Sequence, residues 1–255
     1  ALGTFQPDAR VLGTFRTAIG DDNASVVITA LSVFGEYGFP AGSRPKDLPA
    51  LVAGIRSLAT GADRGHRWQY RTEAAMALAK LEGEKALPDL RAPSEGEPLL
   101  TAGLIAAMGA TGSISALSDI ARYLEDTNPL LRRSALEALQ ALAARNTGKR
   151  GFLDSVYASN IAALDSGDMA VITTAAANLG DSLFLRRESV AALTGALNRL
   201  RSPADIEAIQ EVCKTLAKLG DRNAVGPLEA LMDAGDAAAA QAAAAALTTI
   251  TGENY

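Results

Sequence analysis

The sequence contains one cysteine, one histidine and one tryptophan in 255 residues, and aromatic residues make up only 5% of it. The single cysteine, Cys213, cannot form a disulfide within the chain, and together with one histidine it cannot build a metal cluster. We therefore expect Cys213 to be a buried, unreactive thiol on a helix. No apolar run reaches the roughly 18 residues that a transmembrane helix needs, so we expect no membrane span.

The patterns that usually carry catalysis are also missing. There is no phosphate-binding loop, nucleotide fingerprint, metal-ligand spacing or nucleophile with a base nearby in the sequence. Acidic pairs such as Asp21 with Asp22 and Asp165 with Asp168 lie in expected turns, where Asp commonly caps helices. We predict no catalytic residue, no metal and no cofactor for residues 1–255 alone.

The charge is low and acidic. The formal net charge is −5 and the isoelectric point is about 5.0, whereas proteins that bind nucleic acids usually carry a basic stripe. We predict no nucleic-acid partner. The chain begins with Ala1 and shows no signal-peptide pattern, so we expect a processed chain or an excised segment, and nothing in it indicates a compartment.

What the sequence has in abundance is alanine and leucine at helical spacing. The clearest helix is expected within Asp126–Leu142, where Asn128 is suited to cap the first turn and Pro129 takes the first helical position. The apolar residues that follow share one face of a 3.6-residue period: Leu131, Ala135, Leu139 and Leu142. One such helix cannot bury its apolar face alone, so it needs neighbours of the same kind.

The same pattern recurs along the whole chain, and no segment alternates long enough to predict a strand. In the second expected helix, we place Val26, Ala30 and Phe34 on the inward face. We predict about fourteen helices in seven antiparallel pairs, over residues 8–18, 24–36, 45–58, 67–81, 84–90, 98–108, 113–124, 129–144, 152–164, 169–179, 187–200, 204–219, 224–232 and 236–249.

The apolar ends of the later helices recur at a regular distance. Leu139 and Leu179 are 40 residues apart, Leu179 and Leu219 are 40 apart, and Leu219 and Ile250 are 31 apart. Periods of this length are typical of solenoids built from helical hairpins, in which each hairpin contacts mainly its neighbours.

On these residues the chain resembles HEAT-repeat proteins, specifically the short bacterial repeats that phycobilisome lyases also have. In that family the second helix follows a turn Asp with an aliphatic residue five positions on, then Arg or Lys, then small residues and Ala-Leu. The best match in this sequence consists of Asp126, Leu131, Arg132, Ala135, Ala138 and Leu139. Another match runs from Tyr70 and Arg71 to Leu78, whereas Val27 and Ile172 stand at the Arg position of two other repeats.

The resemblance implies an all-α fold, a right-handed α-α superhelix or HEAT-like solenoid of about seven helical hairpins. It also implies that residues 1–255 form a single solenoid, with the second helices lining its concave face. Because each hairpin would contact only its neighbours, stability would be distributed along the repeats.

The segment from His66 to Arg71 is the most unusual in composition, since it holds the only His and the only Trp together with Tyr70. Trp, Tyr and Arg often anchor binding hot spots, which favours a recognition patch. The alternative is that Tyr70 fills a core position and the arginines pair with nearby carboxylates. The candidate partner-binding residues are His66, Arg67, Trp68, Arg71, Arg132 and Arg133.

From these observations we predict a non-catalytic scaffold that binds a protein or peptide along the concave face. The resemblance also implies alternatives. One is an accessory repeat segment of a larger enzyme, above all a peptidyl-prolyl isomerase whose catalytic domain is a further domain of the same chain. Another is a bilin lyase or chaperone-like protein. A third, a HEAT-like DNA glycosylase, is disfavoured by the acidic charge.

Overall fold

A computed structural model describes residues 9–36, 46–61, 68–91, 96–201, 203–233 and 236–255. All regular structure in these ranges is helical, and no strand occurs among them. This result confirms the predicted all-α class. None of the described helices combines the length and the apolar character that crossing a membrane requires.

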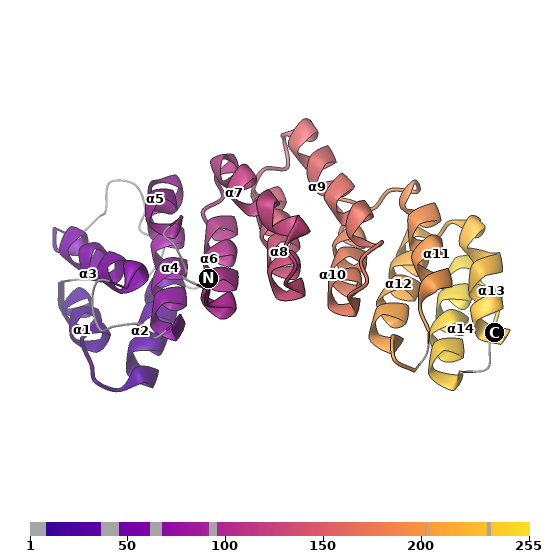
Figure 1. Cartoon of the computed structure of the whole chain (residues 1–255), viewed down its shortest axis with the longest axis horizontal. Coiled ribbons are helices and arrows are strands. Elements are labelled where there is room, and N and C mark those ends of the chain that lie inside the picture. Colours follow the sequence, from indigo (N-terminus) through magenta and orange to yellow (C-terminus); the bar gives the residue numbers. More distant parts are fainter. Residues whose placement is uncertain (1–8, 37–45, 62–67, 92–95, 202, 234–235) are drawn as a thin grey trace. The chain divides into compact units, whose positions relative to one another are not determined.

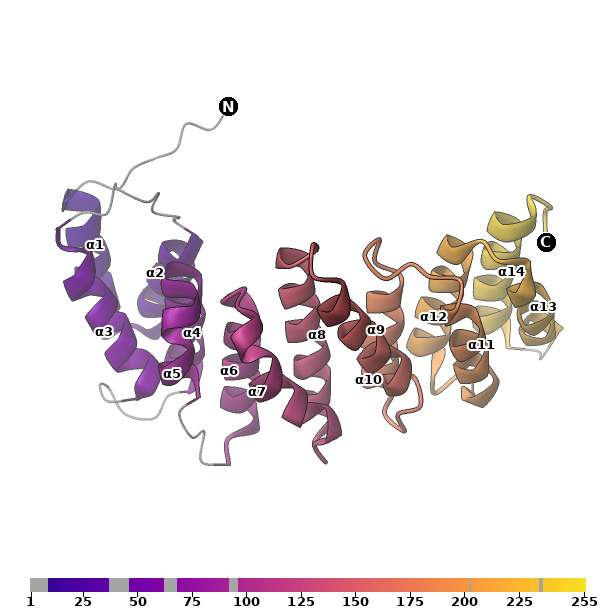
Figure 2. The same ribbon diagram turned by 90° about the horizontal axis from the view of Figure 1, so that it is seen from above.

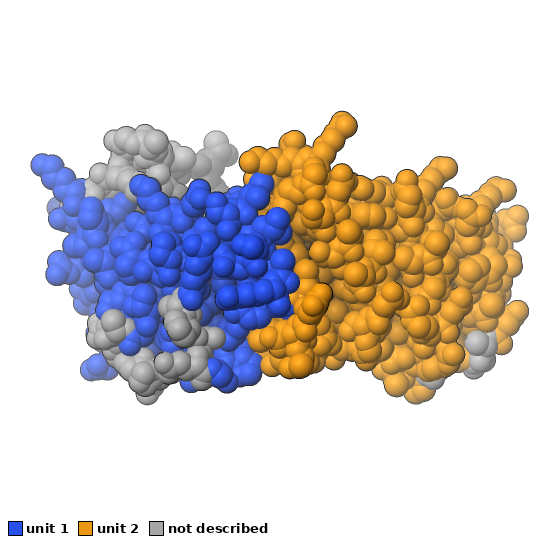
Figure 3. Space-filling model, turned by 45° about the horizontal axis from the view of Figure 1, so that its top comes forward, with its two compact units in different colours: residues 1–123 blue, residues 124–255 orange. Residues whose placement is uncertain are grey.

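The chain divides into two compact units, residues 1–123 and 124–255 (Figure 3). Unit 1 contains α1 (Ala9–Ile19), α2 (Ala24–Glu36), α3 (Leu48–Thr60), α4 (Trp68–Glu82), α5 (Leu87–Leu90), α6 (Pro98–Ala110) and α7 (Leu117–Ala121). Unit 2 contains α8 (Pro129–Arg145), α9 (Arg150–Ala163), α10 (Met169–Leu179), α11 (Ser189–Arg199), α12 (Ile206–Leu219), α13 (Val225–Asp233) and α14 (Ala237–Thr251) (Figure 1). In each hairpin we call the even-numbered helix the second helix.

The second helices of unit 1 pack in a row, because α4 lies between α2 and α6. Of the first helices, α1 packs against α2 and α3 packs against α4. Missing side chains let the row close tightly. A Cβ atom on Gly35 would lie 3.2 Å from the Cα of Ala77, and one on Gly103 would lie 2.1 Å from Cγ2 of Thr72. Glycine at these two positions is therefore what allows α2 and α6 to approach α4 so closely.

Charged groups fasten the first helices of unit 1 to this row. Nε of Arg56 in α3 donates to Oδ2 of Asp89 in α5 at 2.8 Å, and its guanidinium also pairs with Glu82 at the end of α4. The hydrogen bond to Asp89 is the main cause that raises the pKa of Arg56 above its ordinary value. One partly exposed arginine thus connects three consecutive helices.

The second helices of unit 2 form a similar row of α8, α10, α12 and α14, against which α9, α11 and α13 pack (Figure 2). Between α10 and α12, Oγ1 of the buried Thr215 donates to the carbonyl oxygen of Ala176 at 2.9 Å. Nearby, Nζ of Lys218 donates to the carbonyl oxygen of Gly180 at 3.1 Å. These bonds join the middle and the end of α10 to the next repeat.

The contact between α8 and α10 is made differently. Nδ2 of Asn178 in α10 donates to the carbonyl oxygen of Leu136 in α8 at 3.4 Å and to Oδ1 of Asn160 in α9 at 2.9 Å. Asn160 is fully buried, and its own Nδ2 donates to the carbonyl oxygen of Val156 at 2.9 Å. A buried amide that is bonded in this way is satisfied, so this polar contact holds three helices together without an uncompensated group.

Side-chain caps begin several second helices, as the sequence predicts for Asn128. Oδ1 of Asn128 accepts from the backbone N–H of Leu130 at 3.0 Å, and Oδ1 of Asp236 accepts from the first-turn N–H groups of α14. These caps satisfy backbone donors that a helix leaves free at its start. They also fix the residue at which these helices begin.

The last helix differs from the others in what it buries. Three of its four buried side chains are alanines, and the only large one is Leu247. No residue of α14 is charged. The hairpin of α13 and α14 therefore removes little apolar surface from water for its length.

The helix boundaries agree closely with the sequence prediction, and α2 and α10 match it residue for residue. On the predicted inward face of α2, Ala30 and Phe34 are buried, and only Val26 was placed wrongly. Val26 is 38% exposed, whereas Val27 is fully buried. The reason is that α2 carries two adjacent apolar stripes, so periodicity alone does not choose between them. The fourth predicted pair contains the boundary between the units, since α7 ends unit 1 and α8 begins unit 2, and a single solenoid over residues 1–255 stays a prediction.

Candidate binding groove

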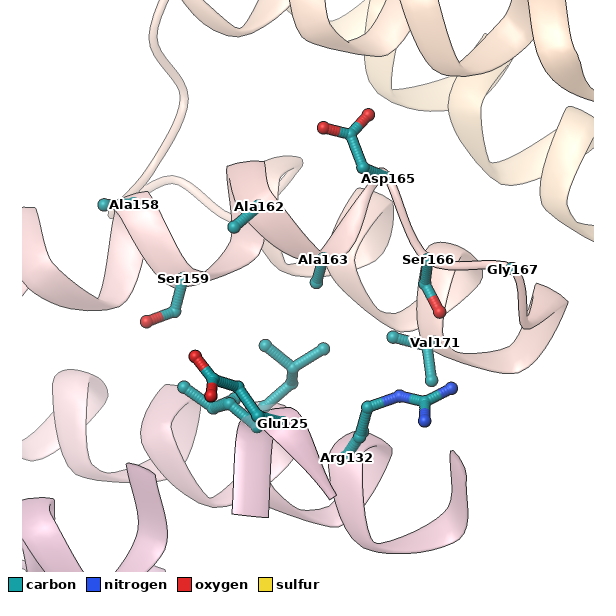
Figure 4. A pocket seen from close by; sticks show the side chains of 12 residues that line it. Glu125, Arg132, Ala158, Ser159, Ala162, Ala163, Asp165, Ser166, Gly167 and Val171 are labelled. Carbon is teal, nitrogen blue, oxygen red and sulfur yellow. The ribbon is translucent and has the colours of Figure 1, made fainter. Parts of the chain in front are cut away.

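Unit 2 contains a groove of about 710 Å³ between α8, α9 and the turn that leads from α9 to α10 (Figure 4). Pockets that hold small molecules or peptide side chains commonly have volumes of roughly 300–1,000 Å³. The groove is lined by Leu124, Glu125, Arg132, Leu136, Ala158, Ser159, Ala162, Ala163, Asp165, Ser166, Gly167 and Val171.

The interior of the groove is apolar and formed by three helices. Leu136 of α8 and Val171 of α10 are buried at 0% and 2% exposure, and they lie in the hydrophobic core of unit 2. On the α9 side the lining residues include Ala158, Ala162 and Ala163. Because these side chains end at Cβ, they do not fill the space between α9 and α8, and a cavity remains where larger residues would meet.

Among the described residues, Arg132 is the only cation that lines the groove. Its Nη1 donates to the carbonyl oxygens of Asp126 at 2.8 Å and Thr127 at 3.3 Å, in the turn before its own helix. Within the described residues no carboxylate lies at ion-pair distance from Arg132. Figure 4 shows the guanidinium directed into the open space. The turn therefore fixes the group in place while some of its N–H donors stay available.

Two carboxylates lie near the groove, and they differ in orientation. The carboxylate of Glu125 points across the opening toward Ser159, whereas that of Asp165 points away from it (Figure 4). Asp165 is also engaged elsewhere, because its Oδ1 lies 2.6 Å from Nη2 of Arg199. The groove thus presents an apolar interior, a fixed positive group from α8 and one negative group from the segment before α8.

The residues predicted to bind a partner are distributed unevenly. His66 and Arg67 lie outside the described residues. Trp68 is half-buried at the first position of α4, and Arg71 follows in the same turn. Nε of Arg71 donates to a main-chain carbonyl, that of Ala59 at the end of α3, at 3.4 Å. Its described partner is therefore an uncharged oxygen rather than a nearby carboxylate.

Arg132 and Arg133 of α8 belong to unit 2, whereas Arg71 belongs to unit 1. Arg132 lines the groove, but Arg133 is exposed and pairs with Glu137 at 2.8 Å, one helical turn later. Arg71 and Arg132 share a motif position and both donate to main-chain oxygens around the turn before their helix. Both arginines thus make a structural contact at the same position of the repeat. Of the two, Arg132 also lines a cavity.

Sequence reasoning missed the rest of the groove. Glu125, Ser159 and the alanines of α9 belong to a first helix or its neighbouring turn, and the prediction concentrated on second helices. The available signal was the spacing of Ala158 and Ala162, four residues apart in a helix whose other face carries Phe152 and Val156. A stripe of small residues at helical spacing predicts close packing or a cavity, and the sequence does not distinguish these outcomes.

Cys213 is buried in α12, as the sequence predicts, with 1% exposure. Burial raises the pKa of its thiol from the ordinary value of 9.0 to about 12. A thiol in this environment stays protonated at neutral pH and is a poor nucleophile. Among the described residues, no group of three or more His, Cys, Asp or Glu side chains is placed to hold a metal ion.

No protein-family model matches the sequence, and no curated protein matches it. Solved structures do match it. The X-ray structure of YibA from Escherichia coli aligns over 97% of this chain and 93% of that one, with 14% identity and a TM-score of 0.52. The chain has a HEAT-like repeat fold. At this level of identity, the likeness shows the fold alone.

Two further structures align with lower scores. The complex of CpcE and CpcF of phycocyanin lyase from Nostoc covers 96% of both chains at 16% identity, with a TM-score of 0.46. Human deoxyhypusine hydroxylase in complex with glycerol covers 96% of this HEAT-like chain and 97% of its own, at 15% identity and a TM-score of 0.41. These likenesses assign no activity to the chain.

Proposed function

We propose that this chain is a non-catalytic scaffold that binds an extended segment of a partner protein, and that the groove beside α8 is where the segment is held. The observation that carries this proposal is the combination, in one cavity, of an apolar interior and a guanidinium fixed by its own turn. A few well-placed polar groups around an apolar interior are typical of binding sites. Binding of the partner along the other second helices stays a prediction. The groove adds to it a defined cavity beside Arg132.

The lining of the groove defines the chemistry of the segment. Leu136, Val171 and the alanines of α9 favour an aliphatic side chain, because burying it removes apolar surface from water on both partners. Arg132 favours a carboxylate next to that side chain, since a guanidinium binds a carboxylate through two parallel hydrogen bonds. Glu125 disfavours a second acidic residue at the opposite side of the opening and favours a basic one.

The polar groups of the groove support binding rather than catalysis. The one hydroxyl that faces Glu125, that of Ser159, donates to the carbonyl oxygen of Ser155 at 3.1 Å. None of the described residues that line the groove is His, Cys, Lys or Tyr. A nucleophilic serine needs an adjacent base that is itself oriented by a third group, and the lining offers none.

The proposal can be tested with a random peptide library displayed on phage and selected on the immobilised full chain. We expect the selected peptides to share an aliphatic residue next to an acidic one. In fluorescence anisotropy with a labelled selected peptide, Arg132→Gln should weaken binding about 10- to 100-fold, as expected when a charge-assisted hydrogen bond is lost. Ala162→Trp, which fills the groove, should abolish binding.

Arg133→Gln is the matched control, because it removes the same charge from the adjacent, solvent-exposed position. Its binding should equal that of the unchanged chain. The proposal is wrong if Arg132→Gln and Arg133→Gln weaken binding equally, or if the selected peptides still bind the Ala162→Trp variant. Melting temperatures separate the roles of Arg132: a lower melting temperature with unchanged binding makes its contact to the turn purely structural.

A further inference from the structure

A second groove of unit 2 lies between the second helices α12 and α14, which pack side by side (Figure 2). Its volume is about 400 Å³. Each helix contributes one stripe at helical spacing, and the lining consists of Gln210, Lys214, Ala217 and Lys218 from α12 and of Ala242, Ala245, Ala246 and Thr249 from α14. All of them lie at least six positions inside the described ranges 203–233 and 236–255. None of them also lines the groove beside α8.

The repeat explains why space remains between these two helices. Counted from the N-cap residue of its helix, Lys218 of α12 stands at position thirteen, and so does Thr249 of α14. The long side chain of Lys218 reaches the preceding second helix, α10, where Nζ donates to the carbonyl oxygen of Gly180 at 3.1 Å. The shorter side chain of Thr249 donates to a carbonyl oxygen of its own helix instead. The space that a lysine would cross therefore stays open between α12 and α14.

The charge of this groove comes from α12. Among the described residues, the lining includes two cations, Lys214 and Lys218, and no carboxylate. Lys218 gives one of its three N–H donors to the uncharged oxygen of Gly180, and no described carboxylate lies at ion-pair distance from it. Nζ of Lys214 lies 3.0 Å from Oε2 of Glu211, but the Lys214 side chain is 60% exposed, and exposed pairs of this kind contribute little. A ligand carboxylate can therefore replace Glu211 at Lys214 and bind Lys218 as well.

The two lysines and the alanines together define the ligand. Lys214 and Lys218 are four residues apart, which is a rise of about 6 Å along α12. In an extended peptide, alternate side chains point to the same side and lie about 6–7 Å apart, so two carboxylates at alternate positions match the lysines. The α14 side offers only methyl groups and one hydroxyl, because α14 has no charged residue. A small residue between the two acidic ones suits that side.

We propose that the groove between α12 and α14 binds an acidic segment of a partner protein, whose carboxylates at alternate positions meet Lys214 and Lys218. Charge complementarity selects this occupant, because the lining is positive although the chain has a net charge of −5. A nucleic acid fits less well, since its binding relies on many phosphate contacts and the groove offers two cations. The proposal does not depend on the groove beside α8, which has a different lining.

Fluorescence anisotropy at low ionic strength tests the proposal with two short labelled peptides of equal composition. One contains glutamate, alanine and glutamate in this order, and the other contains glutamate, glutamate and alanine. The first should bind about threefold more tightly or better, because adjacent side chains of an extended peptide point to opposite sides. Lys214→Gln and Lys218→Gln should each weaken its binding about three- to fivefold, as expected for exposed ion pairs. The matched control is Lys149→Gln, which removes the same charge at an exposed position of unit 2 outside the lining and should leave binding unchanged.

Two further variants change binding in opposite directions. Glu211→Gln should tighten binding, because it removes the carboxylate that competes for Lys214, and a variant that merely damaged the fold would not bind more tightly. Ala245→Glu should abolish binding, because it places a negative charge in the groove. Its matched control is Ala230→Glu, which adds the same charge at an exposed position of α13 outside this lining. Circular dichroism melting curves verify that all variants fold.

The results that overturn the proposal are equally specific. They are a peptide that does not bind, equal binding of the two peptides, and a loss with Lys149→Gln as large as that with Lys218→Gln. Tighter binding of a single-stranded oligonucleotide of the same charge, weakened by Lys218→Gln, also overturns it and assigns the groove to nucleic acid. Ala162→Trp, which fills the groove beside α8, should keep binding of the first peptide. A loss of binding in that variant would place the peptide in the other groove and overturn the proposal too.

Discussion

The α4–α6 contact in unit 1 and the α8–α10 contact in unit 2 join neighbouring repeats in different ways. The first is closed, since Gly103 brings α6 so near to α4 that even a Cβ would overlap Thr72. The second is bridged by Asn178, and alanines of α9 leave a groove beside it. The same helical architecture therefore provides a tight contact in one repeat and a ligand-sized cavity in another, and the side-chain sizes of a few residues decide which.

The largest expected effects come from truncating one fully buried residue of α6 and one of α8. Ile105 and Leu136 both lie eight residues after the cap position of their helix, and both are fully buried. Within the usual range of about 2–5 kcal/mol for such truncations, Ile105→Ala should fall near the top and Leu136→Ala near the bottom. The reason is that the space left by Leu136 opens into the groove, whereas that left by Ile105 stays enclosed.

Urea unfolding followed by circular dichroism measures both losses, and amide hydrogen exchange assigns each loss to its unit. Equal costs for Ile105→Ala and Leu136→Ala would contradict the distinction between a closed and an open contact. Leu139→Ala is a useful reference in α8, because Leu139 is buried and does not line the groove. It should behave like Ile105→Ala.

A matched pair of glycines should show a smaller difference of the same kind. Gly103→Ala forces a methyl group against Thr72, and overpacking of this kind typically costs about 1–3 kcal/mol. Gly167 lines the groove and has no atom within 4 Å of an added Cβ, so Gly167→Ala should change stability by at most about 0.5 kcal/mol. Thermal unfolding of the two variants measures both changes in stability. A destabilisation by Gly167→Ala would mean that the groove closes in solution.

Cys213 reports on the buried core of unit 2 through pH. Its thiol ionises near 9.0 in the unfolded chain and near 12 in the folded one, so above pH 9 the unfolded state loses the proton first. Stability should therefore fall as pH rises through this window, by on the order of 1 kcal/mol between pH 8 and pH 10. Cys213→Ala should lack this part of the decline. Equal declines in both proteins would mean that water reaches Cys213 and that this part of the core is not closed.

The fold was largely predictable because its rules are local. The caps, glycines and prolines mark where helices begin and end, and apolar periodicity marks which segments form them. Prediction failed at Val26 because α2 has apolar residues on two adjacent stripes, and the helices packed against α2 decide which one is buried. That is a property of the neighbours, not of the segment.

The groove was less predictable, for a related reason. Arg132 was found because it belongs to a repeated motif, whereas Glu125 and Ala162 come from other elements that only the packing of α8 and α9 brings near it. A cavity forms where side chains of neighbouring helices are too short to touch. Sequence periodicity shows only which side chains share a face of one helix. Arg71 shows that the motif alone does not predict a cavity. It occupies the same motif position in unit 1, where it donates to the carbonyl oxygen of Ala59.

The alanine-rich interior of α14 has a consequence for how the protein is degraded. With Leu247 as its only large buried side chain, the last hairpin opens at a lower free energy than the hairpins before it. Its amide protons should exchange with solvent earliest in unit 2, by local opening rather than through unfolding of the whole chain. A protease should make its first cut in the hairpin of α13 and α14, while the preceding repeats stay intact.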